Sequence, residues 1–438
     1  MRRFSLGWPD MLRLIYTLLL ALATPLIVGR LWWRGRKEAG YRQYIGERFG
    51  RYPQPPLKNA IWIHAVSVGE VRAALPLIAA CEKQFPQQPI LITCMTPTGR
   101  AMANELFANR AAIAYLPYDF PFAMQRLLAH FKPSCLLIME TEIWFSLVAV
   151  CHQAHVPVLL VNGRLSERSR AGYAKLAPIH LLTREALGNM TVVAAQSAAD
   201  AARFSSLGAR NVVVTGNLKF DLTPDAEIVA RGNAWRAAIP ASKQHVLLAA
   251  STRESEEAML LEAYLTVFDA AARSEILLVI VPRHPQRFDD VFQLIQKNDL
   301  WVIRRSHAAT LNANIQVWLG DSMGEMAAYY ALCDVAIIGG SFAPLGGQNL
   351  IEAAALGKPI IVGPHVFNFS DAVRLAKDAG ALTQVADAEA AMRAAQLLFN
   401  DTSAQQQMGQ AAQKFAEAHR GATTKTMGLI ARAMNPMR

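Results

Sequence analysis

Short, uniformly apolar runs recur along most of the chain and alternate with segments of helical periodicity. In the first half, these runs are "IWIHAV", "PILITC", "AAIAYL", "SCLLIM", "VPVLLV", "TVVAA" and "NVVVTG". Strands that are apolar on both faces are typical of parallel sheets covered by helices on both sides. Their alternation with helices, for example at Glu142 to Ala154 and Ser197 to Leu207, therefore predicts an α/β fold with a doubly wound sheet.

A second series of the same kind begins at "HVLLAAS" and continues through "EILLVIV", "LWVIR", "IQVWLG", "DVAIIGG" and "KPIIVG". A polar, proline-containing segment, "KFDLTPDAEIVARGNAWRAAIPASKQ", separates the two series and indicates a linker. A chain of 438 residues also exceeds one comfortable core. We therefore predict an N-terminal segment at 1–45 and two Rossmann-like domains, 46–220 and 221–438, facing each other across a cleft. Ligands of such sheets bind at the carboxyl ends of the strands.

The stretch from Leu14 to Gly29 is apolar enough to enter a bilayer. It is shorter than the ~20 residues of a full span, but Arg13 and Arg30 at its ends can snorkel to the surface. A cleaved signal peptide is the alternative, because Arg2 and Arg3 precede the stretch; no small-residue cleavage site follows it, however. Positive charge is heavier after the stretch than before it, which predicts an uncleaved membrane helix with the body in the cytoplasm.

The formal net charge is +10, and basic residues gather directly after the apolar stretch. Nucleic-acid binding is one interpretation of such a cluster. Its position beside a membrane helix favours anionic lipid head groups instead, and we expect no nucleic-acid partner. The five cysteines form no CxxC pair, which favours a reducing compartment. The basic cluster consists of Arg30, Arg34, Arg36, Lys37, Arg42, Arg48 and Arg51.

The stretch "AIIGGSFAPLGGQNLIEAAALGKPIIVGP" is the richest candidate site of the second series. A strand ends at Gly339–Ser341, and a helix is expected to open near Asn349 after a second pair of glycines. Paired glycines let backbone amides approach an anion, although they also serve simple turns. Glu352, one turn later, suits a ribose hydroxyl pair. The pattern is neither GxGxxG nor a P-loop, which argues against dinucleotide oxidoreductases and nucleotide-hydrolysing motors.

Charged residues follow other predicted strands. Arg283 sits between prolines, and its guanidinium suits a phosphate or carboxylate, the alternative being a surface turn. Lys219 lies at the domain junction, where a solvated linker lysine is equally consistent. Glu70, Glu140 and Glu142 each stand where a strand meets a helix, and an acid there either caps the helix or acts on a ligand. The two carboxylates at 140 and 142 suggest the binding of a polar or cationic group. Pro76 predicts a kink in the helix after Glu70.

Taken together, these blocks resemble the 3-deoxy-D-manno-octulosonic acid (Kdo) transferases of lipopolysaccharide synthesis. The resemblance extends in order from His64 to Ala372. It implies a GT-B plan, with an acceptor-binding first domain and a nucleotide-sugar-binding second domain. It also implies CMP-Kdo as donor, the lipid A precursor as acceptor, inversion at the anomeric carbon, and neither cofactor nor metal. The matching blocks are "HAVSVGE", "PYDFP", "ETEIW", "NGRLSERS", "TGNLKFD", "PRHPQRF", "GGSF", "GGQNLIEAAALGKPIIVGP" and "NFSDA".

The resemblance further implies roles for individual residues. Glu70 corresponds to the general base, and Glu142 to a residue implicated in activity. Arg72 and Arg100 are additional candidates for the carboxylate of Kdo, because an acidic sugar needs a cation. A structural role is the alternative for these two residues and for Glu142. The residues that correspond to donor and nucleotide contacts are Lys219, Arg283, Ser341, Asn349 and Glu352.

This interpretation places the protein at the bacterial inner membrane, with its catalytic domains in the cytoplasm and anionic lipids as partners. One alternative is another GT-B enzyme or an epimerase that uses UDP-sugars. A second alternative is a membrane-bound scaffold that keeps the fold without catalysis.

Overall fold

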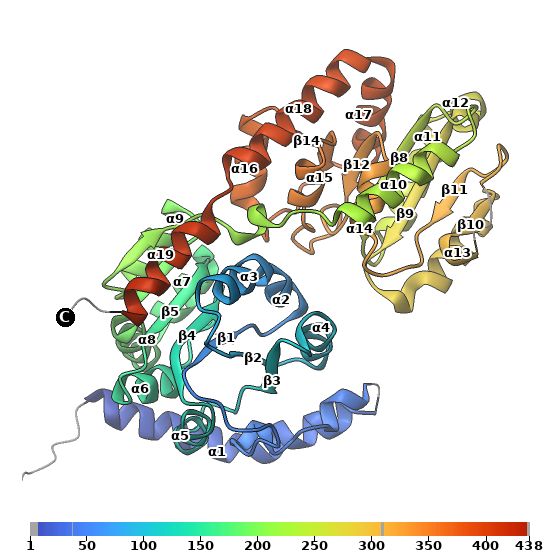
Figure 1. Cartoon of the computed structure of the whole chain (residues 1–438). Coiled ribbons are helices and arrows are strands. Elements are labelled where there is room, and N and C mark those ends of the chain that lie inside the picture. The colour runs from blue at the N-terminus through green and yellow to red at the C-terminus, as the bar shows by residue number, and fades with distance from the viewer. Residues whose placement is uncertain (1–7, 37, 308–310, 436–438) are drawn as a thin grey trace, which may run out of the picture. The chain divides into compact units, whose positions relative to one another are not determined.

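The computed structural model describes residues 8–36, 38–307 and 311–435, and it divides into two compact units. The first runs to Leu222 and also contains the C-terminal segment from Arg420, whereas the second covers Thr223–His419. The break after Leu222 lies two residues from the boundary expected at 220. The expectation that the C-terminal helices all belong to the second domain is wrong for α19 (Ala422–Met434), which packs on the first unit. Each unit is described below by itself (Figure 1).

The first unit is built on a seven-stranded sheet in the order β3-β2-β1-β4-β5-β6-β7, with parallel neighbours throughout. The register places Ile63 of β1 beside Ile92 of β2 and Leu137 of β4. The doubly wound parallel sheet predicted from the apolar runs is therefore confirmed. Its strands are β1 (Ala60–His64), β2 (Ile90–Cys94), β3 (Ala111–Tyr115), β4 (Pro133–Met139), β5 (Val158–Gly163), β6 (Val192–Ala195) and β7 (Val212–Val214).

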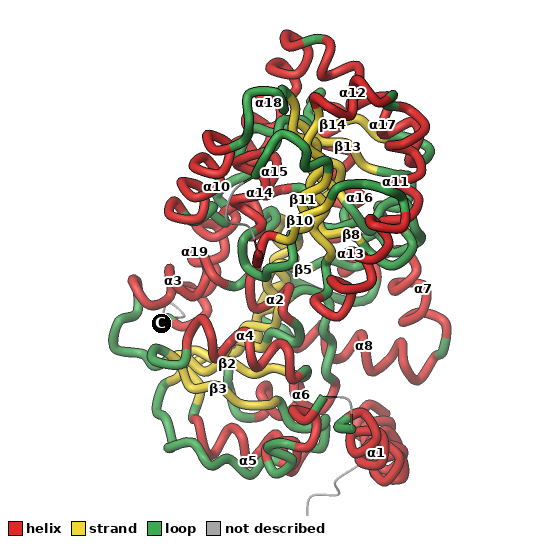
Figure 2. The backbone as a smooth tube through the Cα atoms, turned by 90° about the vertical axis from the view of Figure 1, so that its right-hand side faces the viewer, coloured by secondary structure: helices red, strands yellow, loops and turns green. Residues whose placement is uncertain are grey.

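Helices cover both faces of this sheet, as the tube in Figure 2 shows. Alternate residues of β1 enter separate cores: Ile61 and Ile63 pack with α2, α3, α4 and α19, whereas Trp62 packs with α5, α6 and α8. Pro76 stands in the first turn of α3, so the expected kink is a break between α2 and α3. The helices are α1 (Trp8–Arg34), α2 (Val68–Ala73), α3 (Leu75–Gln84), α4 (Pro97–Phe107), α5 (Pro121–Phe131), α6 (Phe145–Gln153), α7 (Glu167–Lys175), α8 (Ala177–Asn189) and α9 (Ala198–Ser206), with 3-10 turns η1 (Ala39–Arg42), η2 (Glu47–Phe49) and η3 (Leu218–Asp221).

The second unit has its own seven-stranded parallel sheet, ordered β10-β11-β9-β8-β12-β13-β14. The sequence analysis missed β14, whose three residues "LTQ" form no apolar run. The strands are β8 (His245–Thr252), β9 (Ile276–Pro282), β10 (Val302–Arg304), β11 (Val317–Leu319), β12 (Val335–Ile338), β13 (Ile360–Val362) and β14 (Leu382–Gln384). The helices are α10 (Ala226–Ala238), α11 (Glu256–Val267), α12 (Ala270–Glu275), α13 (Phe288–Lys297), α14 (Met326–Leu332), α15 (Ile351–Ala355), α16 (Ser370–Asp378), α17 (Ala388–Asn400) and α18 (Thr402–Ala418), with η4 (Pro285–Arg287) and η5 (Arg305–His307).

Each sheet has one point at which the strand order reverses. In the first unit this switch point lies between β1 and β4, and in the second between β8 and β12. Loops that leave neighbouring strands there diverge to opposite faces and open a crevice at the carboxyl edge. Glu70 and Arg72 follow β1, Glu142 follows β4, and Ser341, Asn349 and Glu352 follow β12, so topology directs attention to both points.

Candidate active site

Glu70 follows β1 and lies in the first turn of α2. Its carboxylate accepts a hydrogen bond from the Val66 amide (2.7 Å) and one from the Ser67 hydroxyl (3.1 Å), so it does cap its own turn. Burial, together with the negative charges of Glu140 and Glu142, raises the pKa of Glu70 to about 8 against the opposing effect of those hydrogen bonds. A carboxyl group with a pKa near neutrality can exchange a proton with a substrate, which a simple cap does not require.

Glu140 follows β4, the strand on the other side of the same switch point. Its backbone adopts φ of 57°, a left-handed conformation that is uncommon for a residue with a side chain. The Lys219 ammonium lies 3.0 Å from one carboxylate oxygen, and the Arg164 guanidinium lies 3.7 Å from the other. The predicted donor-binding Lys219 is therefore held in the first unit, beside the acids.

Asn162 explains how Lys219 is held. It is the second-last residue of β5, has φ of 54°, is fully buried, and accepts a hydrogen bond from the Leu218 amide at 3.0 Å. This contact fixes the backbone directly before Lys219. The strand-end position predicts a ligand contact for Glu140, whereas no role is predicted for Asn162. The signal available was their position at strand ends, but the left-handed backbone and the contact 56 residues away in sequence appear only in the structure.

Glu142 and Arg72 lie in the same part of the first unit. Glu142 is half-buried, and burial is the main cause of its raised pKa, with Glu140 adding to it. Arg72 is exposed on α2, the helix that carries Glu70. Both remain candidates to meet a substrate, Arg72 as a cation for an acidic sugar.

Arg100 does not fit the role predicted for it. It is buried and forms an ion pair with Glu47, which is also buried, and its guanidinium lies over the rings of Tyr44 and Tyr115. The Glu47 carboxylate also accepts the Tyr115 amide at 2.7 Å. Arg100 therefore joins α4 to β3 and η2, and its charge is already neutralised inside the protein.

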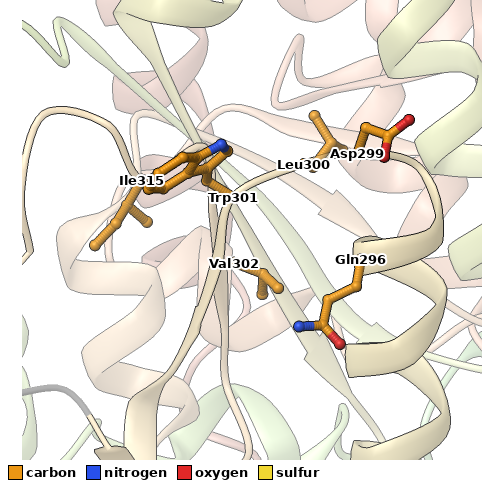
Figure 3. Close-up of a pocket in the computed structure, with 6 residues that line it drawn as sticks. All are labelled: Gln296, Asp299, Leu300, Trp301, Val302 and Ile315. Carbon is orange, nitrogen blue, oxygen red and sulfur yellow. The ribbon is translucent and has the colours of Figure 1, made fainter.

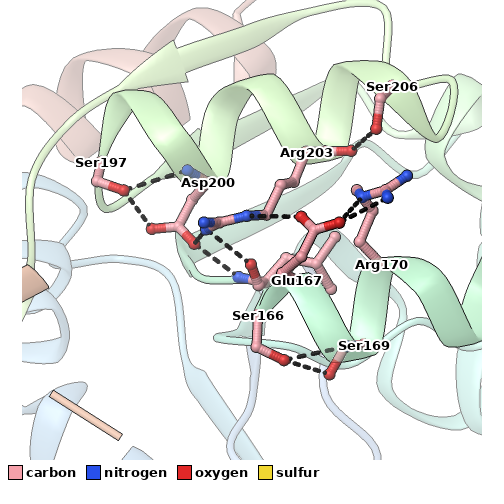
Figure 4. A network of polar contacts seen from close by, with 9 residues as sticks. Ser166, Glu167, Ser169, Arg170, Ser197, Asp200, Arg203 and Ser206 are labelled. Atoms are coloured by element: carbon pink, nitrogen blue, oxygen red, sulfur yellow. Dashed lines mark hydrogen bonds and ion pairs between the residues drawn. The ribbon is translucent and has the colours of Figure 1, made fainter. Parts of the chain in front are cut away.

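The "SERS" part of the matching blocks forms a polar network that joins α7 to α9 (Figure 4). Ser166 caps α7, and Asp200 accepts the Leu165 amide at 2.8 Å. Arg203 donates to the Leu165 carbonyl and pairs with Glu167. The network fixes the chain just after Arg164, so this block supports the site without forming part of it.

In the second unit, Ser341 follows β12 at the other switch point but is fully buried. Its hydroxyl donates to the Ile338 carbonyl (2.5 Å) and accepts the Gly363 amide (2.8 Å). The prediction that the Ser341 side chain contacts a nucleotide is therefore not supported by its position. Ser341 instead ties the end of β12 to the end of β13.

A buried acid, Glu256, organises the same loop. Its carboxylate accepts the amides of Arg253 (2.8 Å), Gly340 (2.6 Å) and Phe342 (2.9 Å). The Gly340 amide, expected to face an anion, is thus already bound to a carboxylate. Gly339 allows this arrangement because a Cβ there would lie 2.6 Å from the Ser251 carbonyl oxygen.

Asn349 and Glu352 form a pair at the start of α15. The Asn349 amide nitrogen donates to the Glu352 carboxylate at 3.0 Å, and its oxygen accepts the Ile351 amide at 3.1 Å. Both side chains are only partly buried, so an incoming ligand can reach them. The helix begins at Ile351, slightly later than expected, and is only five residues long.

Basic side chains gather after β8 and β9 in the second unit. The Arg283 amide donates to the Thr252 carbonyl at 2.9 Å, which joins the two strand ends. Burial, together with the charges of Arg253, Arg283 and Arg287, lowers the pKa of His284. Arg287 pairs with the buried Glu257 at 2.8 Å. The sequence analysis assigned no role to Arg253, whose distance from the other basic residues along the chain hides the cluster.

A hollow in the second unit lies elsewhere. It is lined by residues that precede β10 and β11, at the amino ends of these strands (Figure 3). The candidate residues all follow strands, so this hollow is on the opposite edge of the sheet. Within the described ranges, no group of three or more His, Cys, Asp or Glu side chains is arranged to hold a metal ion.

Two doubly wound parallel-sheet domains with charged residues at the carboxyl ends of their strands are typical of the GT-B fold, which glycosyltransferases share with other sugar-nucleotide enzymes. Residues 43–222 match the family described as 3-deoxy-D-manno-octulosonic-acid transferase (kdotransferase), and residues 247–415 match the glycosyl transferases of group 1. A 3-deoxy-D-manno-octulosonic acid transferase of Bordetella pertussis is 44% identical over 95% of this chain and 98% of its own length. One of Haemophilus influenzae is 34% identical over 96% and 98%. The chain therefore belongs to the Kdo transferase family.

Solved structures show the same architecture at low sequence identity. UDP-GlcNAc 2-epimerase from Neisseria meningitidis covers 85% of this chain and 100% of its own, with a TM-score of 0.59 and 15% identity. At this identity the likeness concerns the fold alone. The family relationship, and not this likeness, separates the chain from the UDP-sugar enzymes considered as an alternative.

Proposed function

We propose that this protein transfers Kdo from CMP-Kdo to a lipid A precursor at the cytoplasmic face of the bacterial inner membrane. Family membership supports Kdo as the sugar that is transferred. One observation supports the mechanism. Glu70 lies at the switch point of the first sheet, and burial and two neighbouring acids raise its pKa to about 8.

In the proposed reaction, the Glu70 carboxylate takes the proton of an acceptor hydroxyl. The hydroxyl oxygen then forms a bond to the anomeric carbon of Kdo, and the bond from that carbon to the phosphate oxygen of CMP breaks with inversion. The electron pair leaves with CMP, whose phosphate gains negative charge that cations can stabilise. Glu142 lies close enough to affect the proton affinity of Glu70 and is proposed to shape the acceptor side.

The donor is proposed to bind through the second unit. Arg283, within the basic cluster after β8 and β9, suits the phosphate, and Glu352 with Asn349 suits the ribose hydroxyls. Lys219 is proposed to reach the donor from its position beside Glu140, and exposed Arg72 to meet the Kdo carboxylate. These groups supply charge and hydrogen bonds, and no step of this mechanism uses a cofactor or a metal.

The proposal is tested with purified full-length protein, CMP-Kdo and a tetraacylated lipid A precursor. Glu70→Ala should lower turnover by roughly 10²–10⁴ while leaving CMP-Kdo binding nearly intact, because only the proton acceptor is lost. Glu105→Gln, an exposed acid on α4, is the matched control. Unchanged turnover of Glu70→Ala would contradict the role of Glu70 as general base. Turnover with UDP-sugars but not with CMP-Kdo would contradict CMP-Kdo as the donor.

A further inference from the structure

Helix α1 is apolar on both of its faces, and one face packs on the first unit. The Arg13 guanidinium pairs with Glu185 of α8 at 2.7 Å, and the Tyr16 ring meets Phe145 of α6 edge to face at 5.3 Å. Leu31 is buried in a cluster with Phe120, which directly precedes α5. These contacts extend from Arg13 to Leu31, about 27 Å along the helix at 1.5 Å per residue.

A buried polar contact adds specificity to this packing. Asp119 of the "PYDFP" block is fully buried and accepts the amides of Ser146 and Leu147 at the start of α6, both at 2.9 Å. The Tyr16 hydroxyl of α1 also hydrogen-bonds to Asp119. A helix surrounded by lipid on all sides has no need for such a partner in a cytoplasmic domain.

The opposite face of α1 is exposed and consists of large apolar side chains. Leu22 is 77% and Leu26 78% exposed. The spacing follows the helical repeat, so the side chains form one stripe along the helix. The exposed members are Trp8, Met11, Leu14, Ile15, Leu18, Leu19, Leu22, Leu26 and Trp33.

Neighbouring helices contribute exposed apolar residues as well. Phe122 at the start of α5 is 45% exposed, and Leu176, Ile179 and Leu181 are exposed at the start of α8. Both helices lie against α1, α5 through the Phe120 cluster and α8 through Glu185. We define the apolar stripe of α1 together with Phe122, Leu176, Ile179 and Leu181 as the apolar face.

Cationic and aromatic side chains stand at the C-terminal end of the stripe. Arg30 and Arg34 are exposed, and the Arg42 guanidinium lies 4.6 Å from the centre of the Trp32 ring. Tryptophan beside arginine is typical of the boundary between acyl chains and head groups. Positive charge at this rim complements anionic lipids rather than a neutral protein surface.

We propose that α1 does not cross the membrane but lies in its plane, docked on the first unit, and that the apolar face dips into the cytoplasmic leaflet. A docked helix of this length cannot stand across the bilayer unless the domain enters the hydrocarbon with it. A helix whose apolar face is inserted into one leaflet binds the membrane surface strongly without crossing the bilayer. The inference is independent of the identity of the donor.

Topology is tested by single cysteines on either side of α1 in the full-length chain. The native cysteines are all buried and should not react with a membrane-impermeant maleimide. Ser5→Cys and Arg36→Cys should both react in inside-out vesicles. Neither variant should react in intact spheroplasts. Reaction of Ser5→Cys in spheroplasts would show that α1 spans the membrane and would overturn the proposal.

Vesicle flotation tests the contribution of α8, which a spanning α1 would leave outside the lipid. On vesicles of phosphatidylethanolamine with phosphatidylglycerol, Ile179→Asn with Leu181→Asn should weaken binding by about tenfold or more. Leu397→Asn, at an equally apolar residue that is 70% exposed in the second unit, is the matched control. Unchanged flotation of the α8 variant would contradict the proposal. A dimer that forms without vesicles and is broken by this variant would show instead that a second copy covers the face.

Discussion

At the residue scale, the acids after β1 and β4 carry the chemistry of the first unit. Glu140 and Glu142 raise the pKa of Glu70, while Lys219 and Arg164 balance Glu140. Removing any member changes the charge that surrounds Glu70. Negative charges on the other side of the switch point raise the pKa of the carboxyl group, which keeps it able to exchange a proton near neutral pH.

The pH profile of kcat/KM tests this electrostatic coupling. A general base acts when deprotonated, so activity should rise with pH through the Glu70 pKa of about 8. Glu140→Gln removes a negative charge and leaves Lys219 and Arg164 nearby, and both effects lower the pKa of Glu70. The rising limb should therefore move to lower pH, whereas Glu105→Gln should leave it in place. A limb that stays or moves to higher pH in Glu140→Gln would contradict the coupling.

At the element scale, several polar residues of the sequence motifs join elements through contacts inside the protein. Arg100 joins α4 to η2 through Glu47, Ser341 joins β12 to β13, and Asp119 holds the start of α6. Each is a polar side chain buried with its partners, which is how a buried polar group avoids an unpaired state. Such residues can influence activity only through the position of the loops that they hold.

Arg100→Ala should destabilise the protein without a specific effect on the donor. The substitution leaves the buried Glu47 carboxylate without its cation, which costs about 3–5 kcal/mol. Urea unfolding measures the loss, and the KM for CMP-Kdo of the folded fraction should stay unchanged. Arg72→Ala is the matched comparison: because Arg72 is exposed, stability should change by less than ~0.5 kcal/mol. Normal stability of Arg100→Ala combined with a raised KM for CMP-Kdo would indicate that Arg100 binds substrate after all.

At the scale of the whole molecule, the C-terminal segment of the chain belongs to the first unit. Asp221 accepts the amides of Gly421 (2.6 Å) and Thr423 (2.5 Å), which joins the two separate chain segments of the first unit. Met427 and Ile430 of α19 then enter the core around β1. Residues separated by the entire second unit are therefore required for the stability of the unit that contains Glu70.

Ile430→Ala should weaken the first unit selectively. Ile430 is fully buried, so truncation removes apolar contacts and leaves a cavity, at a cost of about 2–5 kcal/mol. Hydrogen exchange followed by mass spectrometry should show faster exchange in β1, β2 and β4 and no change in β8, β9 and β12. Leu261→Ala, at a buried residue of α11, should give the reverse pattern. Loss of protection in the second unit of Ile430→Ala would contradict the assignment of α19.

Sequence alone determined the features that depend on composition and local pattern. Runs apolar on both faces require a parallel sheet covered on both sides, which predicted the doubly wound fold and directed attention to strand ends such as Glu70, Lys219 and Arg283. It missed β14 because three residues carry too little pattern. It could not show that Arg100 and Ser341 find their partners inside the protein, because a polar residue looks the same in sequence whether its partner is a ligand or the protein.

Tertiary structure decided what depends on contacts between distant segments. The apolar character of α1 is visible in the sequence, but only packing shows that one of its faces belongs to the protein and the other is exposed. In the same way, the raised pKa of Glu70 results from burial and from acids on another strand. A hydrophobic pattern is local and can be recognised along the sequence. Electrostatic and packing interactions join residues that are distant in sequence, so they can be identified only once the fold is known.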